Sequence, residues 1–312
     1  MSQTQFPNET SPRGDFVRQK SAFREAVSAD GSSGFPAEPG RYHLYVSYAC
    51  PWASRAIIVR MLKGLEDVIS MTVVDPERDE KGWRLHEDEP DPINGFDFLA
   101  EAYELTHPGF GDRVTVPLLW DTNENRAVSN ESSEIIRMLN SEFNAWAECP
   151  SLDLCPEDLR EEIDEINSRV YGSINNGVYR CGFAGTQAAY DEAFADLFSA
   201  LDWADDLLDR KRYLTGDRIT EADWRLFVTL VRFDTAYVGH FKCNLRRIAD
   251  YRNLSGYLRD LYQQPGISET VKIDHIKRHY YRTHPAINPT RIVPAGPELD
   301  FDSPPERQHL SL

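Results

Sequence analysis

A single cysteine marks the junction between a predicted strand and a predicted helix, and this junction constrains the fold more than any other part of the chain. The run His43–Ala49 is apolar and strand-like, and Cys50 follows it directly. Pro51 suits the first turn of a helix, because an N–H there would have no intrahelical partner, and Ala53–Leu62 continues at helical spacing. The pattern predicts a strand–helix unit with Cys50 at the N-terminus of the helix.

The position of Cys50 also indicates its chemistry. Free backbone amides and the helix dipole favour a thiolate over a thiol at a helix N-terminus, and Arg55 is expected to add to this effect. Ala53 stands where a C-x-x-C motif would have its second cysteine, so we interpret the site as a one-thiol exchanger whose disulfide partner comes from outside the protein. The alternative is a buried structural cysteine.

The elements around the cysteine follow the order of a thioredoxin-like domain. After the helix we expect a strand, a polar insertion over residues 75–112, a hairpin and a closing helix, with the bounds Val68–Val74, Thr115–Trp120, Arg126–Val128 and Ser132–Asn140. Two parallel strands joined by a helix, then an antiparallel pair and a helix, make up that fold. Residues 41–145 are expected to form this α/β domain, and residues 1–40 an extended arm that lies on it.

Helical spacing dominates the second half of the chain, after a linker bounded by prolines. Apolar positions recur with a helical period in four segments: Leu159–Ser173, Ala188–Leu208, Ala222–Tyr237 and Leu254–Gln263. We expect an all-α helical bundle over residues 156–285 and a tail over residues 286–312. Thr220 and Asp223 fit a capping box, to which we assign no chemistry.

Two short motifs in the first half are suited to a peptide-like ligand. Val116-Pro117 begins the third strand, where a thioredoxin-like setting favours a cis peptide bond and leaves the neighbouring backbone to pair with the ligand. Glu131-Ser132 begins the next helix, where a hydroxyl and free amides suit a carboxylate and the acidic side chain suits an ammonium group. The alternative for this pair is simple capping of the helix.

Cysteine and histidine spacing favours neither a disulfide framework nor a metal site. The five cysteines are sparse, odd in number and without a C-x₂-C pair. Cys149 and Cys155 are the one close pair; we interpret them as loop residues, with a regulatory disulfide as the alternative. His275 and His279 lie four residues apart but lack a third ligand, so structural roles are favoured and no metal is expected.

Net charge and hydropathy indicate the class of partner. The charge of −17 disfavours nucleic acid and anionic membranes, so a small-molecule partner is expected. No run reaches the roughly 18 apolar residues of a membrane span, and the N-terminus has no apolar secretory segment. A cytoplasmic location is expected.

Three long motifs resemble one class of a known superfamily. The segments Tyr48–Ala53, Asn175–Ala184 and His279–Pro289 occur in this order, and together they resemble the Xi class of the glutathione transferases, the glutathionyl-hydroquinone reductases. The resemblance runs over about residues 10–300. It implies a thioredoxin-like glutathione-binding domain followed by an all-helical domain, glutathione as the thiol co-substrate, and a homodimer.

The resemblance implies a role for each matching residue. Cys50 matches the catalytic thiol, and Glu131 and Ser132 match a clamp on the γ-glutamyl group. The glutathione-contacting set comprises Trp83, His86, Val116, Pro117, Glu131 and Ser132. His86 stands where an arginine often contacts the glycyl carboxylate, which leaves open another γ-glutamyl thiol that lacks glycine.

Three tyrosines match residues that face the hydroquinone: Tyr179, Tyr280 and Tyr281. Tyr179 and Tyr280 are also expected to supply a hydrogen bond or a proton to the ring. The alternative for all three is packing in a core.

The expected function is glutathione-dependent reduction of glutathionyl-hydroquinones to hydroquinones. The expected intermediate is a mixed disulfide between Cys50 and glutathione, and oxidised glutathione is released. One alternative is an omega-like glutathione transferase with thiol transferase or dehydroascorbate reductase activity. A second is a non-catalytic binding protein built on the same fold.

Overall fold

The computed structural model describes residues 9–85 and 90–310, which fall into two compact units. The first unit holds residues 19–153, and the second holds residues 154–310 together with residues 9–18 of the N-terminal segment.

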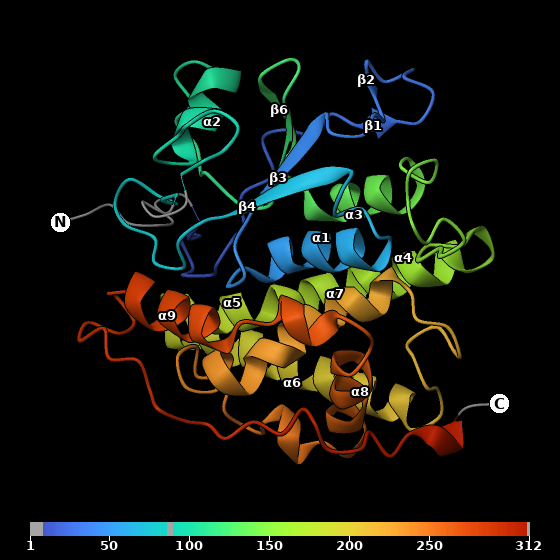
Figure 1. The fold of residues 1–312 in the computed structure, drawn as a ribbon. Helices are drawn as coiled ribbons and strands as arrows, with labels where there is room; N and C mark the ends of the chain where they lie inside the picture. Colours follow the sequence, from blue (N-terminus) through green and yellow to red (C-terminus); the bar gives the residue numbers. More distant parts are fainter. Residues whose placement is uncertain (1–8, 86–89, 311–312) are drawn as a thin grey trace. The chain divides into compact units, whose positions relative to one another are not determined.

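The first unit is built on a four-stranded mixed sheet with the order β4-β3-β5-β6 (Figure 1). The strands are β3 (Tyr42–Val46), β4 (Ile69–Val73), β5 (Leu118–Asp121) and β6 (Arg126–Ser129). Strands β3 and β4 are parallel, and the other two pairings are antiparallel. The helices α1 (Pro51–Leu62) and α3 (Ser132–Ser141) pack against each other. This confirms the predicted thioredoxin-like order.

The first unit differs from the predicted pattern at the ends of two strands and in the polar insertion. Strand β5 begins at Leu118 instead of Thr115, because Pro117 has no N–H for a sheet hydrogen bond. Strand β3 ends at Val46 instead of Ala49, because the Ser47 hydroxyl accepts a hydrogen bond from the Ala49 amide at 3.3 Å and the chain turns there. The polar insertion contains the helix α2 (Ala100–Thr106). Two very short strands, β1 (Val27–Ser28) and β2 (Phe35–Pro36), precede the main sheet.

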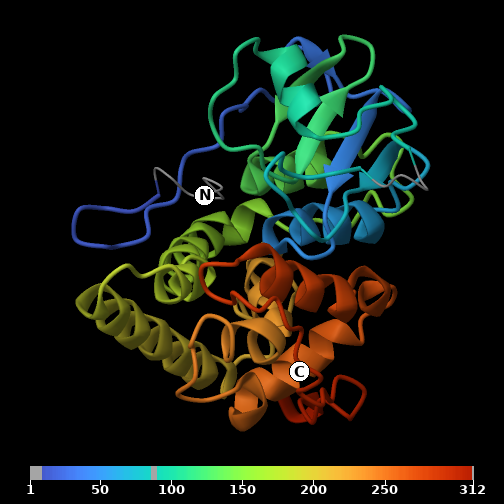
Figure 2. The same ribbon diagram turned by 90° about the vertical axis from the view of Figure 1, so that its left-hand side faces the viewer.

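The second unit is built from helices, as the apolar spacing predicts (Figure 2). They are α4 (Arg160–Arg169), α5 (Gly177–Gly182), α6 (Gln187–Leu208), α7 (Glu221–Arg232), α8 (Arg252–Tyr262) and α9 (Ile273–Thr283). Two of the predicted helices end in π-helical turns: η2 (Val170–Asn175) follows α4, and η3 (Phe233–Tyr237) follows α7. Short 3₁₀ turns lie at Glu157–Leu159, Ile248–Asp250, Ile267–Thr270 and Gln308–Leu310.

The predicted capping box stabilises the start of α7. Asp223 accepts hydrogen bonds from the amides of Thr220 and Leu214 at 2.8 and 2.9 Å, and from the Tyr257 hydroxyl at 2.8 Å. Burial raises the pKa of this carboxyl, while the hydrogen bonds oppose the rise. The motif is therefore structural, as predicted.

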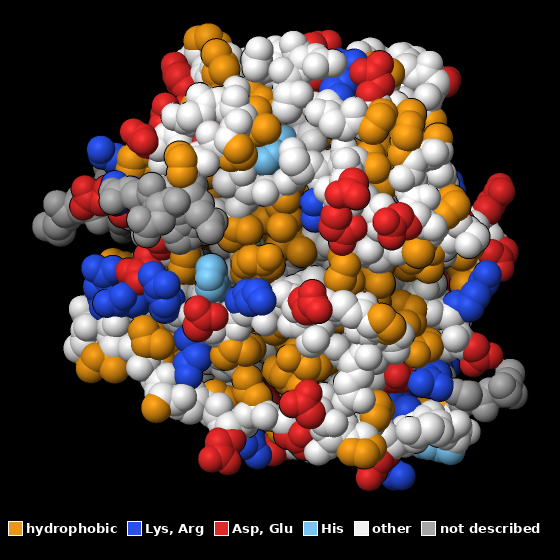
Figure 3. All heavy atoms as spheres, viewed as in Figure 1, with side chains coloured by type: hydrophobic (Ala, Val, Ile, Leu, Met, Phe, Trp, Pro, Cys, Tyr) orange, Lys and Arg blue, Asp and Glu red, His pale blue; other side chains and the backbone are white. Residues whose placement is uncertain are grey.

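Charged side chains of both signs are scattered over the face shown in Figure 3, between larger areas of hydrophobic and other groups. The whole chain carries 51 acidic and 34 basic residues. Among the helices of the described residues, none is both long and apolar enough to cross a membrane.

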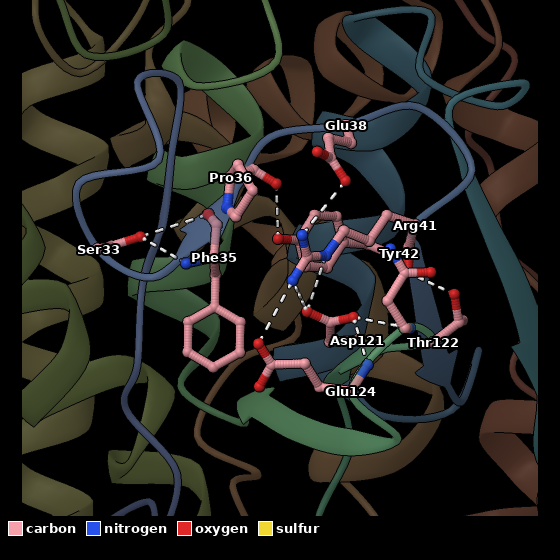
Figure 4. A network of polar contacts seen from close by, with 10 residues as sticks. Ser33, Phe35, Pro36, Glu38, Arg41, Tyr42, Asp121, Thr122 and Glu124 are labelled. Atoms are coloured by element: carbon pink, nitrogen blue, oxygen red, sulfur yellow. Dashed lines mark hydrogen bonds and ion pairs between the residues drawn. The ribbon is translucent and has the colours of Figure 1, made fainter.

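A buried ion pair fixes the hairpin to the start of β3 (Figure 4). The Arg41 guanidinium donates to the Asp121 carboxylate at 2.6 and 2.9 Å, and the other carboxylate oxygen accepts from the amides of Asn123 and Glu124 in the hairpin turn. Thr122 donates back to the Arg41 carbonyl. These contacts stabilise the pairing of β3 with β5. They thereby help to position Pro117, which directly precedes β5.

Candidate functional site

Cys50 lies at the N-terminus of α1, as the sequence predicts. It is the N-cap residue, its backbone is extended, and Pro51 takes the first position of the helix. Its Sγ donates a hydrogen bond to the Val116 carbonyl at 3.4 Å, and 9% of its surface is exposed. The helix dipole therefore acts on a sulfur that lies against the segment leading into β5.

The Val116-Pro117 peptide bond is cis, which confirms the prediction for this motif. The preceding residue, Thr115, is fixed through its carbonyl, which accepts from the Tyr103 hydroxyl at 2.8 Å. Asn130 also donates to the Thr115 hydroxyl at 2.9 Å. Asn130 thereby connects this segment to the start of α3.

Glu131 and Ser132 stand at the N-terminus of α3. The Glu131 carboxylate caps the helix, accepting from the Ser133 amide and hydroxyl at 3.1 and 2.7 Å, and it also accepts from the Ser21 hydroxyl at 2.9 Å. Burial alone would raise the pKa of Glu131, but these hydrogen bonds and the positive charge of Arg55 together lower it. Capping is thus present, and the same group is a carboxylate suited to an ammonium partner.

Arg55 lies close to the same helix terminus, in a role that sequence reasoning did not identify. Its side chain is buried, its guanidinium is 4.5 Å from the centre of the Trp52 ring, and Nη1 donates to the Ser132 hydroxyl at 3.3 Å. These are contacts with Trp52 and Ser132, and the expected effect of Arg55 on the Cys50 thiolate stays a prediction. Its spacing of five residues from Cys50 gave no signal for this contact.

Trp83 is held in the insertion by backbone pairing. Its carbonyl accepts from the Leu99 amide at 2.9 Å, and the adjacent Arg84 forms a bridge with Phe98. Only 4% of the Trp83 surface is exposed. His86, the other insertion residue in the expected set, lies outside the described residues.

Asp91 attaches this insertion to the sheet. It accepts from the Tyr45 hydroxyl at 3.0 Å and from the amides of Ile93 and Asn94 at 3.3 and 2.9 Å. The part of the insertion around Asp91 is therefore anchored to Tyr45, the next-to-last residue of β3.

The predicted tyrosines separate into two environments in the second unit. Tyr179 on α5 and Tyr280 on α9 have hydroxyl oxygens 2.8 Å apart, and the Tyr237 hydroxyl of η3 lies 2.9 Å from that of Tyr280. Tyr281 points to a different group and donates to the Thr235 carbonyl at 3.4 Å. Sequence reasoning missed Tyr237, because its spacing fits the apolar face of a core helix.

Burial fixes the protonation of two of these tyrosines. It raises the pKa of Tyr237 and Tyr280 well above the usual value, and the neighbouring Tyr179 adds to both increases. Tyr237 and Tyr280 therefore remain neutral hydrogen-bonding groups.

Close packing explains why glycine and asparagine occur in the motif Asn175–Ala184, which contains Tyr179. A Cβ on Gly182 would lie 2.3 Å from the Phe241 ring, so only glycine lets α5 approach that ring. Asn175 donates to the Arg225 carbonyl and the Thr229 hydroxyl at 2.9 and 2.7 Å and ties the motif to α7. Among the described residues, no group of three or more His, Cys, Asp or Glu is placed to hold a metal ion.

Known protein families match segments in both units of the chain. Residues 49–142 match the model of the glutathione S-transferase N-terminal domain, and residues 187–260 match that of the C-terminal domain. The chain is 53% identical over 287 residues to the glutathionyl-hydroquinone reductase PcpF of Sphingobium chlorophenolicum, covering 91% of this chain and 90% of that protein.

Two solved structures are also similar along most of their length. One is the Xi-class glutathione transferase of Natrialba magadii, with 51% identity, a TM-score of 0.91 and coverage of 96% of each chain. The other is the glutathione-bound structure of YqjG, a glutathione transferase homologue of Escherichia coli K-12, with 50% identity, a TM-score of 0.89 and coverage of 91% of this chain and 96% of that chain.

Proposed function

Because the chain belongs to the Xi class of the glutathione transferases, the glutathionyl-hydroquinone reductases, we propose that it reduces glutathionyl-hydroquinones with glutathione through a Cys50–glutathione mixed disulfide. The observation that carries this mechanism is the position of Cys50 at the N-terminus of α1, with its sulfur 3.4 Å from the Val116 carbonyl. The sulfur therefore lies at the positive end of the helix dipole, next to backbone suited to a peptide-like ligand.

The glutathione moiety would be held by groups of the first unit. The α-carboxylate of the γ-glutamyl group suits Ser132 and the free amides at the start of α3, and its ammonium suits the Glu131 carboxylate. The cysteinyl part would pair with the Val116 backbone beside Pro117, and Trp83 would contact the tripeptide from the insertion. A γ-glutamyl thiol without glycine is the alternative co-substrate, since the proposed set has His86 in place of an arginine.

In the first step the Cys50 thiolate attacks the glutathione sulfur of the substrate. The sulfur–sulfur bond forms, the bond between sulfur and the aromatic carbon breaks, and that carbon takes up a proton, so that the hydroquinone leaves and the mixed disulfide remains. An aryl carbanion is a poor leaving group, so the step requires a keto tautomer of the ring or a positioned acid. Tyr179 or Tyr280 would donate to the ring oxygen or supply that proton.

In the second step a glutathione thiolate attacks the mixed disulfide. The new sulfur–sulfur bond joins two glutathiones, the bond to Cys50 breaks, and Cys50 leaves as the thiolate that starts the next cycle. The two glutathiones leave oxidised, as the disulfide, and the two electrons they give up leave with the hydroquinone, whose carbon–sulfur bond has been replaced by a carbon–hydrogen bond. One protein cysteine is therefore sufficient.

The test is turnover of a glutathionyl-hydroquinone with glutathione, in the wild type, in Cys50→Ser and in the control Cys149→Ser. Cys149 is an exposed free thiol in the same unit. We expect fast reduction in the wild type and the control, and none in Cys50→Ser. Reduction of dehydroascorbate or a small disulfide in place of the hydroquinone conjugate would instead support an omega-like transferase. No turnover of either kind of substrate in the wild type, with glutathione binding that survives Cys50→Ser, would support a binding module.

Two further parts of the proposal need their own measurements. Turnover with γ-glutamylcysteine in place of glutathione would show that the glycyl carboxylate is dispensable, and loss of all turnover would exclude the shorter thiol.

We also propose a homodimer, as the resemblance implies; sedimentation equilibrium giving the mass of one chain would contradict it.

A further inference from the structure

Three tyrosine hydroxyls of the second unit form a connected group, the tyrosine cluster of Tyr179, Tyr237 and Tyr280. Tyr280 is in the middle, with its oxygen 2.8 Å from that of Tyr179 and 2.9 Å from that of Tyr237. The exposed fraction is 8% for Tyr179, 1% for Tyr280 and 0% for Tyr237. The cluster therefore has a fully buried end at Tyr237 and a more accessible end at Tyr179.

Ring packing holds the buried end in place. The Tyr237 ring stacks on Phe241 with centroids 5.5 Å apart, and the Tyr280 ring stands nearly perpendicular to Tyr237 at 5.3 Å. Tyr237 also ends the π-helical turn η3, a kind of distortion that often occurs at functional sites. These contacts leave its hydroxyl directed at Tyr280.

The number of protons that each hydroxyl can donate determines the donor and the acceptor in each hydrogen bond of the tyrosine cluster. A phenol has one proton to donate, and within residues 9–85 and 90–310 the hydrogen bond recorded for the Tyr237 hydroxyl is the one to Tyr280. If Tyr237 accepted from Tyr280, its own proton would be buried without an acceptor, which is unfavourable. We therefore assign Tyr237 as the donor to Tyr280 and Tyr280 as the donor to Tyr179, so that the Tyr179 proton is directed out of the cluster.

We propose that Tyr237 is a positioning residue that acts through Tyr280 to orient and polarise the Tyr179 hydroxyl, which alone in the cluster donates a hydrogen bond to the ring oxygen of the hydroquinone. This inference rests on the proposed function and divides its tyrosines by role. Hydrogen bonds in a chain strengthen one another, so Tyr179 becomes a better donor as negative charge develops on the ring oxygen. Because burial keeps Tyr237 and Tyr280 protonated, the hydrogen bonds of the tyrosine cluster persist across the working pH range.

Replacing Tyr237 with phenylalanine removes one hydroxyl and keeps the ring. We expect kcat to fall by about tenfold, with KM for both substrates unchanged within about twofold. The alkaline limb of the kcat profile, which reports loss of the Tyr179 proton, should move to higher pH, because the Tyr179 phenolate loses part of its stabilisation. The matched control is Tyr257→Phe: Tyr257 is equally buried, and its hydroxyl donates to Asp223 at 2.8 Å outside the cluster. It should leave the profile in place.

A double-mutant cycle separates action through Tyr280 from a general packing effect. In a Tyr280→Phe background, Tyr237→Phe should cause no further loss of kcat, since the connection is already broken. An equal loss in both backgrounds would overturn the proposal. So would an unchanged kcat and pH profile in a Tyr237→Phe variant that melts like the wild type.

A measurement independent of turnover distinguishes this inference from the proposed function. In protein labelled with ¹³C at the tyrosine ring carbon that bears the hydroxyl, NMR follows the ionisation of Tyr179, assigned by Tyr179→Phe. We expect the Tyr179 pKa to rise in Tyr237→Phe and to fall when a ring-fluorinated, more acidic tyrosine occupies position 237. An unchanged pKa in both variants would refute the inference. A wild type that titrates as expected but reduces no glutathionyl-hydroquinone would refute only the proposed function.

Discussion

At the scale of single residues, Arg55 is the buried cation near the proposed glutathione site whose contact with Ser132 the sequence did not predict. Its guanidinium donates to Ser132 and lowers the pKa of Glu131, so it supplies positive charge where the substrate's carboxylate would bind. It also stacks on Trp52, which fixes its orientation. We therefore propose that Arg55 contributes to glutathione recognition as well as to the thiol.

Replacing Arg55 with glutamine should weaken glutathione binding more than chemistry. We expect KM for glutathione to rise by about tenfold, because a charge-assisted contact is lost, and kcat to change by less than about threefold. Steady-state kinetics with varied glutathione would measure both. The matched control is Arg126→Gln, whose side chain is 41% exposed and 3.9 Å from Glu25. An unchanged KM in a folded Arg55→Gln variant would contradict this role.

Two buried histidines predict how stability depends on pH. Burial lowers the pKa of His43 and of His240 to about 4, whereas an unfolded chain titrates near the ordinary value of about 6.5. Between these values the unfolded state binds more protons, so the unfolding free energy falls as pH decreases, by up to about 1.4 kcal/mol per pH unit for each histidine.

Denaturant unfolding at pH 7 and pH 5 would measure this loss. His43 lies between the hydroxyls of Ser70 and Thr72 at 2.7 and 2.9 Å, so His43→Gln keeps hydrogen-bonding capacity there while removing one titrating group. The variant should show a shallower dependence on pH than the wild type. An identical slope in both would show that His43 does not titrate in this range.

At the scale of elements, the approach of α5 to Phe241 places Tyr179. Gly182 has no room for a side chain, and the aromatic rings of Tyr179, Phe183 and Phe241 pack together around it. The prediction of helices missed α5, because its glycines weaken the helical signal in six residues.

Adding a methyl group at Gly182 should therefore disturb both stability and the tyrosine cluster. We expect Gly182→Ala to lower the unfolding free energy by about 1–3 kcal/mol, since the new Cβ would overlap a buried ring. Gly172→Ala is the control, because a Cβ there meets nothing within 4 Å. Thermal melting compares the two. A Gly182→Ala variant as stable as the control would mean that the Phe241 ring can move aside at little cost.

At the scale of the whole molecule, the N-terminal segment contributes hydrogen bonds to each unit. Ser21, Phe23 and Arg24 pair with residues 129–131 of the first unit. Arg18 donates to Asn176 of the second unit at 2.7 Å and lies 4.7 Å from the Tyr179 ring centre. The segment is thus connected to the proposed binding residues of both units.

Removing residues 1–24 should impair glutathione binding as well as stability. The deletion takes away the Ser21 hydrogen bond that helps hold Glu131 ionised, so we expect KM for glutathione to rise by about tenfold. Ser21→Ala should reproduce part of this rise without the loss of stability. Kinetics and melting of both variants test the prediction, and an unchanged KM in the truncated chain would contradict it.

Local sequence determined the strand–helix junction, because alternation, helical spacing and a proline after Cys50 act over a few residues. The same local signals predicted the helical second half and the capping box at Thr220 and Asp223. The order of elements indicated the thioredoxin-like domain, and the three long motifs indicated the Xi class.

Tertiary structure alone decided which side chains meet. Ser132 and Arg55 are 77 residues apart, and Tyr179 and Tyr280 are 101 apart, so no local pattern can place their atoms within hydrogen-bonding distance. The tyrosine cluster depends on a π-helical turn and on a glycine that admits one ring. Such contacts result from packing and hydrogen-bond satisfaction across the whole fold, which local residue preferences do not encode.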